Sequence, residues 1–198
     1  MEVKFKRKYD RILEILEAVA ECAGENLILV GGTALSIFYL KHRVSIDLDF
    51  VPFSGDDIKL KEALKACLSK KGYHTMRAAH GNQFVVNFDD TAIKIEIFEP
   101  EVKVGFVEHK VGNVSLRVAP IEDLLKMKEI SYADRKAAKD LYDMVFILKS
   151  MSAGYGKVEE MIEKYGLPAD MGEMEKMAEQ ENYQFFERVV KDASKAGN

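Results

Sequence analysis

The sequence has few cysteines and prolines, no tryptophan and no long apolar run. It holds 2 cysteines and 4 prolines among 198 residues. Cys22 and Cys67 stand alone without metal-ligand spacing, which offers no zinc site. We expect both to be buried thiols in a reducing compartment. No run reaches the roughly 20 apolar residues that cross a bilayer, so we expect a cytoplasmic protein without a membrane partner.

An excess of positive charge is also missing. The formal net charge is −4 and the isoelectric point is near 5.7. A broad, unspecific nucleic-acid binder is normally basic, so composition gives a nucleic-acid partner no support, and any such partner must be bound by a local patch or by metal ions. Hydrophobic content of 47% with 31% charged residues is typical of globular proteins. The first residues, basic and then apolar but interrupted by acids, predict an amphipathic helix and not a secretory signal.

The first part of the chain alternates helix and strand signals. Apolar spacing predicts a helix over 4–20, and a run ended by glycines predicts a buried strand over 26–32. Further elements are a helix over 33–42 with Thr33 as N-cap, a strand over 44–53 and a helix over 54–72. Strands are then expected at 73–79, 83–89, 92–99, 104–110 and 114–119. Their tight links favour antiparallel hairpins.

Pro120 opens a helical remainder, with helices expected over 121–133, 135–151, 157–165 and 173–193. The tail carries a stripe of Tyr183, Phe185, Phe186 and Val189, which is more often core than interface. We therefore predict an α+β or α/β fold with a mixed sheet and flanking helices over 1–119. A helical C-terminal region would follow over 120–198.

Two aspartates interrupt the strand "SIDLDFV". Alternation places Asp47 and Asp49 on one face and the apolar side chains between them on the other. Two residues on one face lie about 6.6–6.8 Å apart along a strand, so the carboxylates repel. A divalent cation removes this penalty, and oxygen ligands suit Mg²⁺. The plainer alternative is an edge strand with an acidic outer face.

A later strand, "AIKIEIF", repeats the pattern. Its isoleucines take one face, and Lys94 and Glu96 take the other. If the two strands are neighbours, Glu96 joins the aspartates as a third carboxylate. The turn "VGGT" ends a strand and starts a helix, where glycines let a phosphate approach the backbone. Together these features indicate metal-assisted phosphoryl or nucleotidyl transfer.

These residues carry a resemblance to a known family. "GGT" before a helix, "HRVSIDLDF" and "IKIEIF" resemble the polymerase-β-type nucleotidyltransferase superfamily. "KEISYADRKAAKDLYD" adds similarity to the AbiEii/AbiGii nucleotidyltransferases, the toxin halves of some toxin–antitoxin pairs. The resemblance covers residues 26–148. It implies a nucleotidyltransferase-type sheet and a Mg²⁺-dependent enzyme, with Mn²⁺ as an alternative ion, that moves a nucleoside monophosphate from an NTP to a hydroxyl.

The resemblance also implies roles for particular residues. Gly31, Gly32 and Thr33 would meet the triphosphate, and Asp47, Asp49 and Glu96 would be catalytic and hold the metal. Lys128 and Asp140 match the later motif, implicated in nucleotide contact or catalysis. The acceptor implied for relatives is RNA such as tRNA, with a protein or small molecule as alternatives, and a cognate antitoxin is the implied protein partner.

Several residues keep two interpretations. Arg43 and Ser45 precede the aspartates on the same face and could bind phosphate, or Arg43 could pair with Asp47. Lys94 could neutralise an acid or a phosphate. By spacing alone, Asp140 and Asp143 favour a solvated acid pair.

Two other functions stay open. One is a nucleotide-binding or regulatory module of the same fold without turnover. The other is a nucleotidyltransferase that modifies an antibiotic.

Overall fold

The computed structural model describes residues 2–78 and 80–151 and seven isolated positions beyond them, 159, 160, 163, 164, 172, 176 and 180. Two compact units divide the chain: unit 1 holds residues 1–34 and 44–120, and unit 2 holds residues 35–43 and 121–198. The helices expected over 157–165 and 173–193 and the tail stripe lie mostly or wholly outside the described residues. No described helix is both long and apolar enough to span a membrane.

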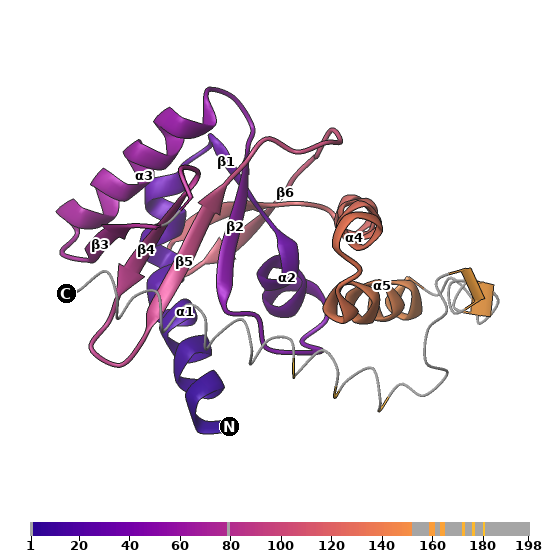
Figure 1. The fold of residues 1–198 in the computed structure, drawn as a ribbon. Helices are drawn as coiled ribbons and strands as arrows, with labels where there is room; N and C mark the ends of the chain where they lie inside the picture. Colours follow the sequence, from indigo (N-terminus) through magenta and orange to yellow (C-terminus); the bar gives the residue numbers. More distant parts are fainter. Residues whose placement is uncertain are drawn as a thin grey trace. The chain divides into compact units, whose positions relative to one another are not determined.

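Unit 1 is built on a mixed seven-stranded sheet, as the alternating patterns predict (Figure 1). The strand order is β3-β4-β5-β2-β1-β7-β6. The strands are β1 Leu27–Val30, β2 Asp47–Pro52, β3 His74–Arg77, β4 Gln83–Asn87, β5 Ala92–Ile97, β6 Val107–Val111 and β7 Val114–Val118. The expected hairpins β3–β4, β4–β5 and β6–β7 are antiparallel, while β2–β5 and β1–β7 are parallel.

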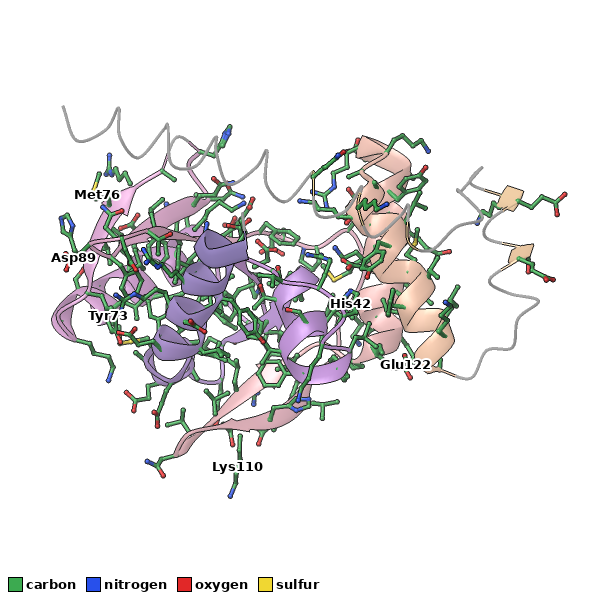
Figure 2. The ribbon with its side chains drawn as sticks, turned by 90° about the horizontal axis from the view of Figure 1, so that it is seen from below. His42, Tyr73, Met76, Asp89, Lys110 and Glu122 are labelled. Carbon is green, nitrogen blue, oxygen red and sulfur yellow. A yellow bond between two sulfur atoms is a disulfide. The ribbon has the colours of Figure 1, made fainter. Side chains whose placement is uncertain are left out.

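Two long helices pack on the sheet and on each other (Figure 1). These are α1 Glu2–Ala23 and α3 Asp57–Lys70. The apolar face of α1 is buried, including Ile12, Ile15 and Val19. Asp56 caps α3 by accepting a hydrogen bond from the backbone N–H of Lys59 at 2.9 Å. The sheet ends in the outer strand β6, from which Lys110 projects away (Figure 2).

The prediction of two free thiols is wrong, because Cys22 and Cys67 form a disulfide. Cys22 lies near the end of α1 and Cys67 in α3, and their Cα atoms are 5.7 Å apart. That separation is within the range that a disulfide spans. The two residues are 45 positions apart in the chain, so only helix packing reveals the pairing. The disulfide removes the free-thiol argument for a reducing compartment.

Two local predictions need correction. The helix after the glycines begins at Gly31 as α2 Gly31–Ala34 and continues as the π-helix η1 Leu35–Tyr39, so Thr33 lies inside it and is not the N-cap. β2 begins at Asp47 and not at residue 44. Arg43 and Ser45 therefore lie outside the strand, and the alternation that placed them beside the aspartates does not apply.

Unit 2 contains η1 and the helices α4 Ile121–Arg135 and α5 Ala138–Ser150, which pack against each other. Both helices match the predicted pair. Burial in α5 runs from Asp140 to Val145 and includes Ile147 and Leu148. The helix thus carries buried acids among its apolar residues.

Candidate functional site

The glycine turn joins β1 to α2 with a close backbone approach. Gly31 has φ of +73°, a conformation that side-chain-bearing residues rarely adopt. A Cβ at this position would lie 2.6 Å from Oδ2 of Asp49. The hydroxyl of Thr33, which is fully buried, donates a hydrogen bond to the backbone oxygen of Asp47. The turn is therefore fastened against the start of β2.

Three acids form a carboxylate row, which we define as Asp47, Asp49 and Glu96. β2 and β5 are parallel neighbours, with Asp47 opposite Lys94 and Asp49 opposite Glu96. The condition for a third carboxylate beside the aspartates is thus met. Leu48 and Phe50 are fully buried beneath the sheet surface, whereas the side chains of Asp47 and Glu96 remain 14% and 21% exposed. The apolar side chains anchor the strand and turn the acids outward.

Lys94 lies against this row. Its Nζ is 3.2 Å from Oε2 of Glu96 and 3.8 Å from Oδ2 of Asp47. Burial lowers the pKa of Lys94, but Asp47, Asp49 and Glu96 outweigh it and the net shift is upward. Of the two interpretations of Lys94, the structure thus shows pairing with acids.

Hydrogen bonds fix Glu96. Asn82 Nδ2 donates to Oε1 of Glu96 at 2.8 Å, and Gln83 hydrogen-bonds the same carboxylate. Burial raises the pKa of Glu96, but Lys94 and these hydrogen bonds prevail and lower it. Glu96 is therefore held as a carboxylate.

Lys8 is a site residue that the sequence reasoning missed. Its side chain in α1 is fully buried. Burial lowers the pKa of Lys8 to about 8, Asp47 opposes this shift and Lys94 adds to it. The available signal was helical spacing, because Lys8 is four residues before Ile12 on the apolar face of α1. A lysine at such a position indicates an acid within reach.

The chemistry of the row fits a hard divalent cation. Oδ1 of Asp47 is buried and has no hydrogen-bond partner among the described residues, which is costly for an acceptor unless an ion or water meets it. All donors in the row are carboxylate oxygens, the type that Mg²⁺ and Mn²⁺ prefer. Within the described part of the chain, no three His, Cys, Asp or Glu side chains converge closely enough to hold a metal. A Mg²⁺ ion commonly binds one or two carboxylates and takes its other ligands from water and substrate phosphates.

Unit 2 contains a buried ion-pair network, defined as Arg43, Lys128, Arg135, Asp140 and Asp143. Lys128 Nζ lies 2.8 Å from both Asp140 Oδ1 and Asp143 Oδ2. Arg43 donates to both oxygens of Asp143 at 2.5 and 2.7 Å. Arg135 binds Asp140 in the same two-pronged manner, at 2.6 and 2.8 Å. Such bidentate pairs are strong and fix orientation.

The network corrects the prediction of a solvated acid pair. Asp140 and Asp143 are both 0% exposed. For Asp143, burial raises the pKa, but Arg43 and Lys128 outweigh it and hold the value well below the ordinary one. For Asp140, burial is likewise outweighed, by Lys128 and Arg135, and the pKa is lowered. Spacing alone missed this because the cations come from other segments of the chain: Arg43 from the segment after η1, and Lys128 and Arg135 from α4.

Other predicted residues lie as follows. Arg43 pairs with Asp143 through both of its carboxylate oxygens. His42 Nε2 lies 2.7 Å from Oδ1 of Asp143, and its ring stacks on Tyr142 at 5.6 Å between centroids. Ser45 is buried just before β2. The structure thus groups the glycine turn and the carboxylate row in unit 1, and Arg43, Lys128 and Asp140 in unit 2.

Comparisons with known proteins identify a family, one relative and two structures of the same fold. A family model described as "Nucleotidyl transferase AbiEii toxin, Type IV TA system" matches residues 14–196. A protein of Aquifex aeolicus strain VF5, aq_aa25, is 26% identical over 164 residues, covering 81% of this chain and 75% of that protein.

Two solved structures share the fold. MenT4, the nucleotidyltransferase toxin Rv2826c of Mycobacterium tuberculosis H37Rv, matches with a TM-score of 0.50 and 17% identity, over 70% of this chain and 58% of that one. An antigenic nucleotidyltransferase-like protein of Paracoccidioides brasiliensis matches with a TM-score of 0.50 and 13% identity, over 88% and 93%. At these identities the likeness shows the fold alone.

Proposed function

Because the chain belongs to the AbiEii family of nucleotidyl transferase toxins, we propose that it transfers a nucleoside monophosphate from an NTP to a hydroxyl acceptor with Mg²⁺. The acceptor oxygen forms a bond to the α-phosphorus, and the bond from this phosphorus to the bridging oxygen breaks. Pyrophosphate leaves with the electron pair, and the acceptor hydroxyl loses its proton to a base.

The register between β2 and β5 is the observation that carries this proposal. It places Asp49 opposite Glu96, with Asp47 on the same face, beside a glycine turn that only a residue without Cβ can form. Three carboxylates on one sheet face repel one another, and a structural role does not require them. A cation and a phosphate-bearing substrate account for both the acids and the glycine.

We assign roles to the residues of unit 1. Asp47, Asp49 and Glu96 would hold Mg²⁺, or Mn²⁺, which fits the same oxygen donors. When bound, the ion supplies charge neutralisation for the triphosphate and activation of the acceptor hydroxyl. The backbone of Gly31, Gly32 and Thr33 would receive the triphosphate, and Glu96 would face the acceptor. The protein's own contribution is positioning and electrostatics.

The family motif in unit 2 suggests a second contribution. Lys128, Arg43 and Asp140 would serve the nucleotide through the buried ion-pair network. Ser45, which precedes β2, would be a further phosphate contact. Arg135 supports this assignment, because its side chain is 47% exposed while Lys128 is 8% exposed. A phosphate approaching the network would therefore meet Arg135 first.

Label transfer tests the enzyme proposal. The protein is incubated with each α-labelled NTP and with total cellular RNA and protein, and the labelled fraction identifies the acceptor as RNA, such as tRNA, or as protein. Asp47→Asn with Asp49→Asn should abolish the label. Asp89→Asn with Asp134→Asn removes the same charge from exposed positions and should leave it intact.

Two results would overturn the proposal. Transfer that survives Asp47→Asn with Asp49→Asn contradicts the role of the carboxylate row. Calorimetry that shows NTP binding indifferent to Mg²⁺, with no label in any acceptor, would instead identify a binding module.

The toxin role is a separate proposal that rests on the family. Expression of the chain should arrest growth, and a cognate antitoxin should relieve the arrest. The Asp47→Asn, Asp49→Asn variant should be harmless. Arrest by this inactive variant would show that toxicity does not depend on nucleotidyl transfer.

A further inference from the structure

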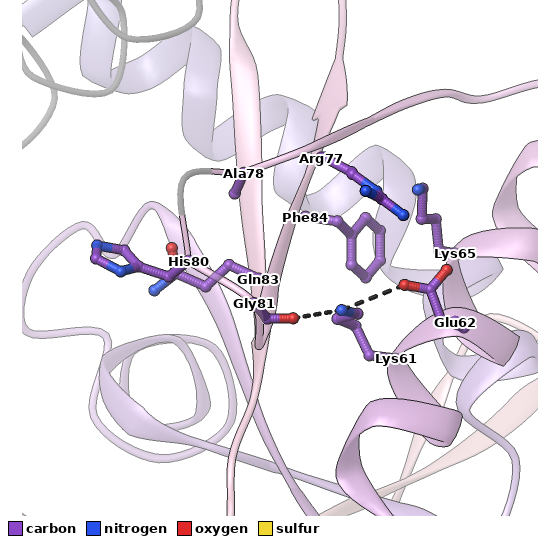
Figure 3. Close-up of a pocket in the computed structure, with 9 residues that line it drawn as sticks. All are labelled: Lys61, Glu62, Lys65, Arg77, Ala78, His80, Gly81, Gln83 and Phe84. Carbon is purple, nitrogen blue, oxygen red and sulfur yellow. Dashed lines mark hydrogen bonds and ion pairs between the residues drawn. The ribbon is translucent and has the colours of Figure 1, made fainter.

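A pocket of about 220 Å³ lies between α3 and the β3–β4 hairpin of unit 1 (Figure 3). Its wall includes Lys61 and Lys65 from α3, Arg77 at the end of β3, and Gly81, Gln83 and Phe84 around the start of β4. None of these residues belongs to the carboxylate row, although Gln83 hydrogen-bonds Glu96. The pocket is therefore distinct from the carboxylate row.

Positive charge dominates the pocket. Lys61, Lys65 and Arg77 face a single acid of the lining, Glu62. Lys61 is already engaged, because its Nζ donates to the backbone oxygen of Gly81 and lies 3.2 Å from Oε1 of Glu62. Contact with Lys61 lowers the pKa of Glu62, and Lys65 and Arg77 add to this from farther away.

Lys65 and Arg77 are the cations left for a ligand. Their side chains extend toward each other at one side of the pocket (Figure 3). Among the described residues, neither side chain forms an ion pair with a carboxylate. Two like charges that extend toward each other repel. An anion between them would reverse that penalty.

The pocket shares a wall with the carboxylate row. Gln83 lines the pocket and is the cross-strand partner of Glu96, which it also hydrogen-bonds. The neighbouring Asn82 donates to Glu96 and accepts a backbone hydrogen bond from Ile97 at 3.1 Å. Residues 81–83 thus separate the basic pocket from the carboxylate on the acceptor side.

The volume limits the ligand. A site for one water needs roughly 10–15 Å³, and pockets for drug-sized ligands begin near about 300 Å³. At about 220 Å³, the pocket accommodates a compact anionic group with part of what carries it, and not a whole nucleotide.

We propose that this pocket is the place where a nucleic-acid acceptor is held, through one of its backbone phosphates. The inference rests on the proposed function, because it takes the bound nucleic acid to be the acceptor of the transferred nucleotide. The binding itself does not require turnover. A nucleic acid carries phosphates at regular intervals before a terminal hydroxyl. One phosphate in the pocket would hold the strand while its end reaches Glu96.

Charge favours this acceptor over the alternatives. The protein has a net charge of −4 and presents three acids around the transfer site, so a polyanion is repelled unless a local patch receives it. A protein hydroxyl or a cationic small molecule needs no such patch. Lys65 and Arg77 supply the patch that overall composition lacks.

Oligonucleotide binding tests the proposal. The probes are fluorescein-labelled 12-nucleotide single strands of RNA and DNA, measured by anisotropy with EDTA and without NTP. Lys65→Glu with Arg77→Glu should weaken binding by at least about tenfold. It should also flatten the logarithmic salt dependence by about 1.4, since each single-strand phosphate contact contributes about 0.7.

Matched variants control for charge and folding. Lys103→Glu with Lys110→Glu makes the same change at exposed positions outside the pocket and should bind like the original chain. Lys65→Gln with Arg77→Gln removes the two charges without reversing them. Its unfolding temperature is measured to check that this variant folds, and it should also bind the probes more weakly. If the RNA and DNA probes bind with equal affinity, the protein contacts the phosphate backbone alone. If RNA binds more tightly, the protein also contacts the ribose 2′-hydroxyl.

Three outcomes would overturn the proposal. They are equal weakening by the pocket and control pairs, displacement of the probe by polyglutamate as readily as by polyphosphate, and binding of a phosphoserine peptide in place of the oligonucleotides. Failure of the proposed function looks different: the strand then binds and depends on Lys65 and Arg77, but no nucleotide is transferred to it.

Discussion

The carboxylate row of unit 1 and the buried ion-pair network of unit 2 both gather acids, but they compensate them differently. Asp140 and Asp143 are fully buried, and lysine and arginine groups bind their oxygens at 2.5–2.8 Å. Asp47 and Glu96 stay partly exposed, Lys94 lies 3.2–3.8 Å away, and Oδ1 of Asp47 has no hydrogen-bond partner among the described residues. The acids of the network are thus fully paired with cations inside the protein, whereas the acids of the row keep an acceptor atom open for a ligand.

The largest effect is expected when one acid is removed from each group. Asp143→Asn leaves Arg43 and Lys128 buried without their partner, so we expect a loss of about 3–5 kcal/mol in the free energy of unfolding. Asp49→Asn should instead change the unfolding free energy by less than about 1 kcal/mol and reduce nucleotidyl transfer by at least about 10²–10³-fold. Urea unfolding and label transfer measure the two effects.

The contrast would be wrong if Asp143→Asn kept its stability or if Asp49→Asn lost it. A stable Asp143→Asn variant would show that Asp143 is not needed to hold the network together. An unfolded Asp49→Asn variant would make the carboxylate row a structural element.

The glycine turn gives the next largest effect. Gly31→Ala places a Cβ 2.6 Å from Oδ2 of Asp49 at a positive φ, so we expect a loss of about 1–3 kcal/mol in stability and a large loss of transfer. Gly24→Ala is the matched control, because it has φ of +54° but nothing within 4 Å of its Cβ position. It should lose stability without losing transfer. Equal transfer by both variants would contradict the role of the turn.

Lys94 allows a sharper test of the row. We expect Lys94→Met to bind Mg²⁺ at least about tenfold more tightly, since it removes an ammonium that competes for the same oxygens. Its unfolding temperature should therefore rise more steeply with Mg²⁺ in the absence of NTP. Lys110→Met, on the outer strand β6, is the control. An unchanged Mg²⁺ dependence would mean that Lys94 does not compete with the ion.

Acid produces the smallest effect. Because the pKa of Asp143 is lowered in the folded protein, the unfolded chain binds more protons near its own pKa of about 3.9. The stabilisation is complete above that value and is lost as the pH falls toward the folded-state pKa. At pH 4 the loss is a few tenths of a kcal/mol, and it grows below. The stability difference between the original chain and Asp143→Asn should shrink accordingly; a constant difference down to pH 3 would contradict it.

The faces of the strands could be predicted from the sequence, because alternation is a local property. Ile95 and Glu96 are assigned to opposite faces by their order alone, and the parallel register then sets Glu96 beside Asp49. Periodicity likewise predicted α1 and α3.

Pairings that depend on packing between distant elements could not be predicted. Lys8 comes near Asp47 only because α1 covers the sheet, and Arg43 reaches Asp143 across 100 positions of the chain. The Cys22–Cys67 bond has the same origin in the contact of two helices. The prediction of Thr33 as an N-cap failed for the same reason. Threonine suits an N-cap, but here its hydroxyl donates a hydrogen bond to the backbone oxygen of Asp47 in β2.

The Cys22–Cys67 disulfide also makes part of the chain a covalent ring. Residues 22–67 close on themselves, and Gly31, Asp47 and Asp49 lie inside the ring while Glu96 lies outside it. The exposed turn at 53–56 is a place where a protease could cut. A single cut there separates the aspartates from Glu96 along the backbone, yet the ring keeps the two fragments joined. They would part on a denaturing gel only after a reductant opens the bond.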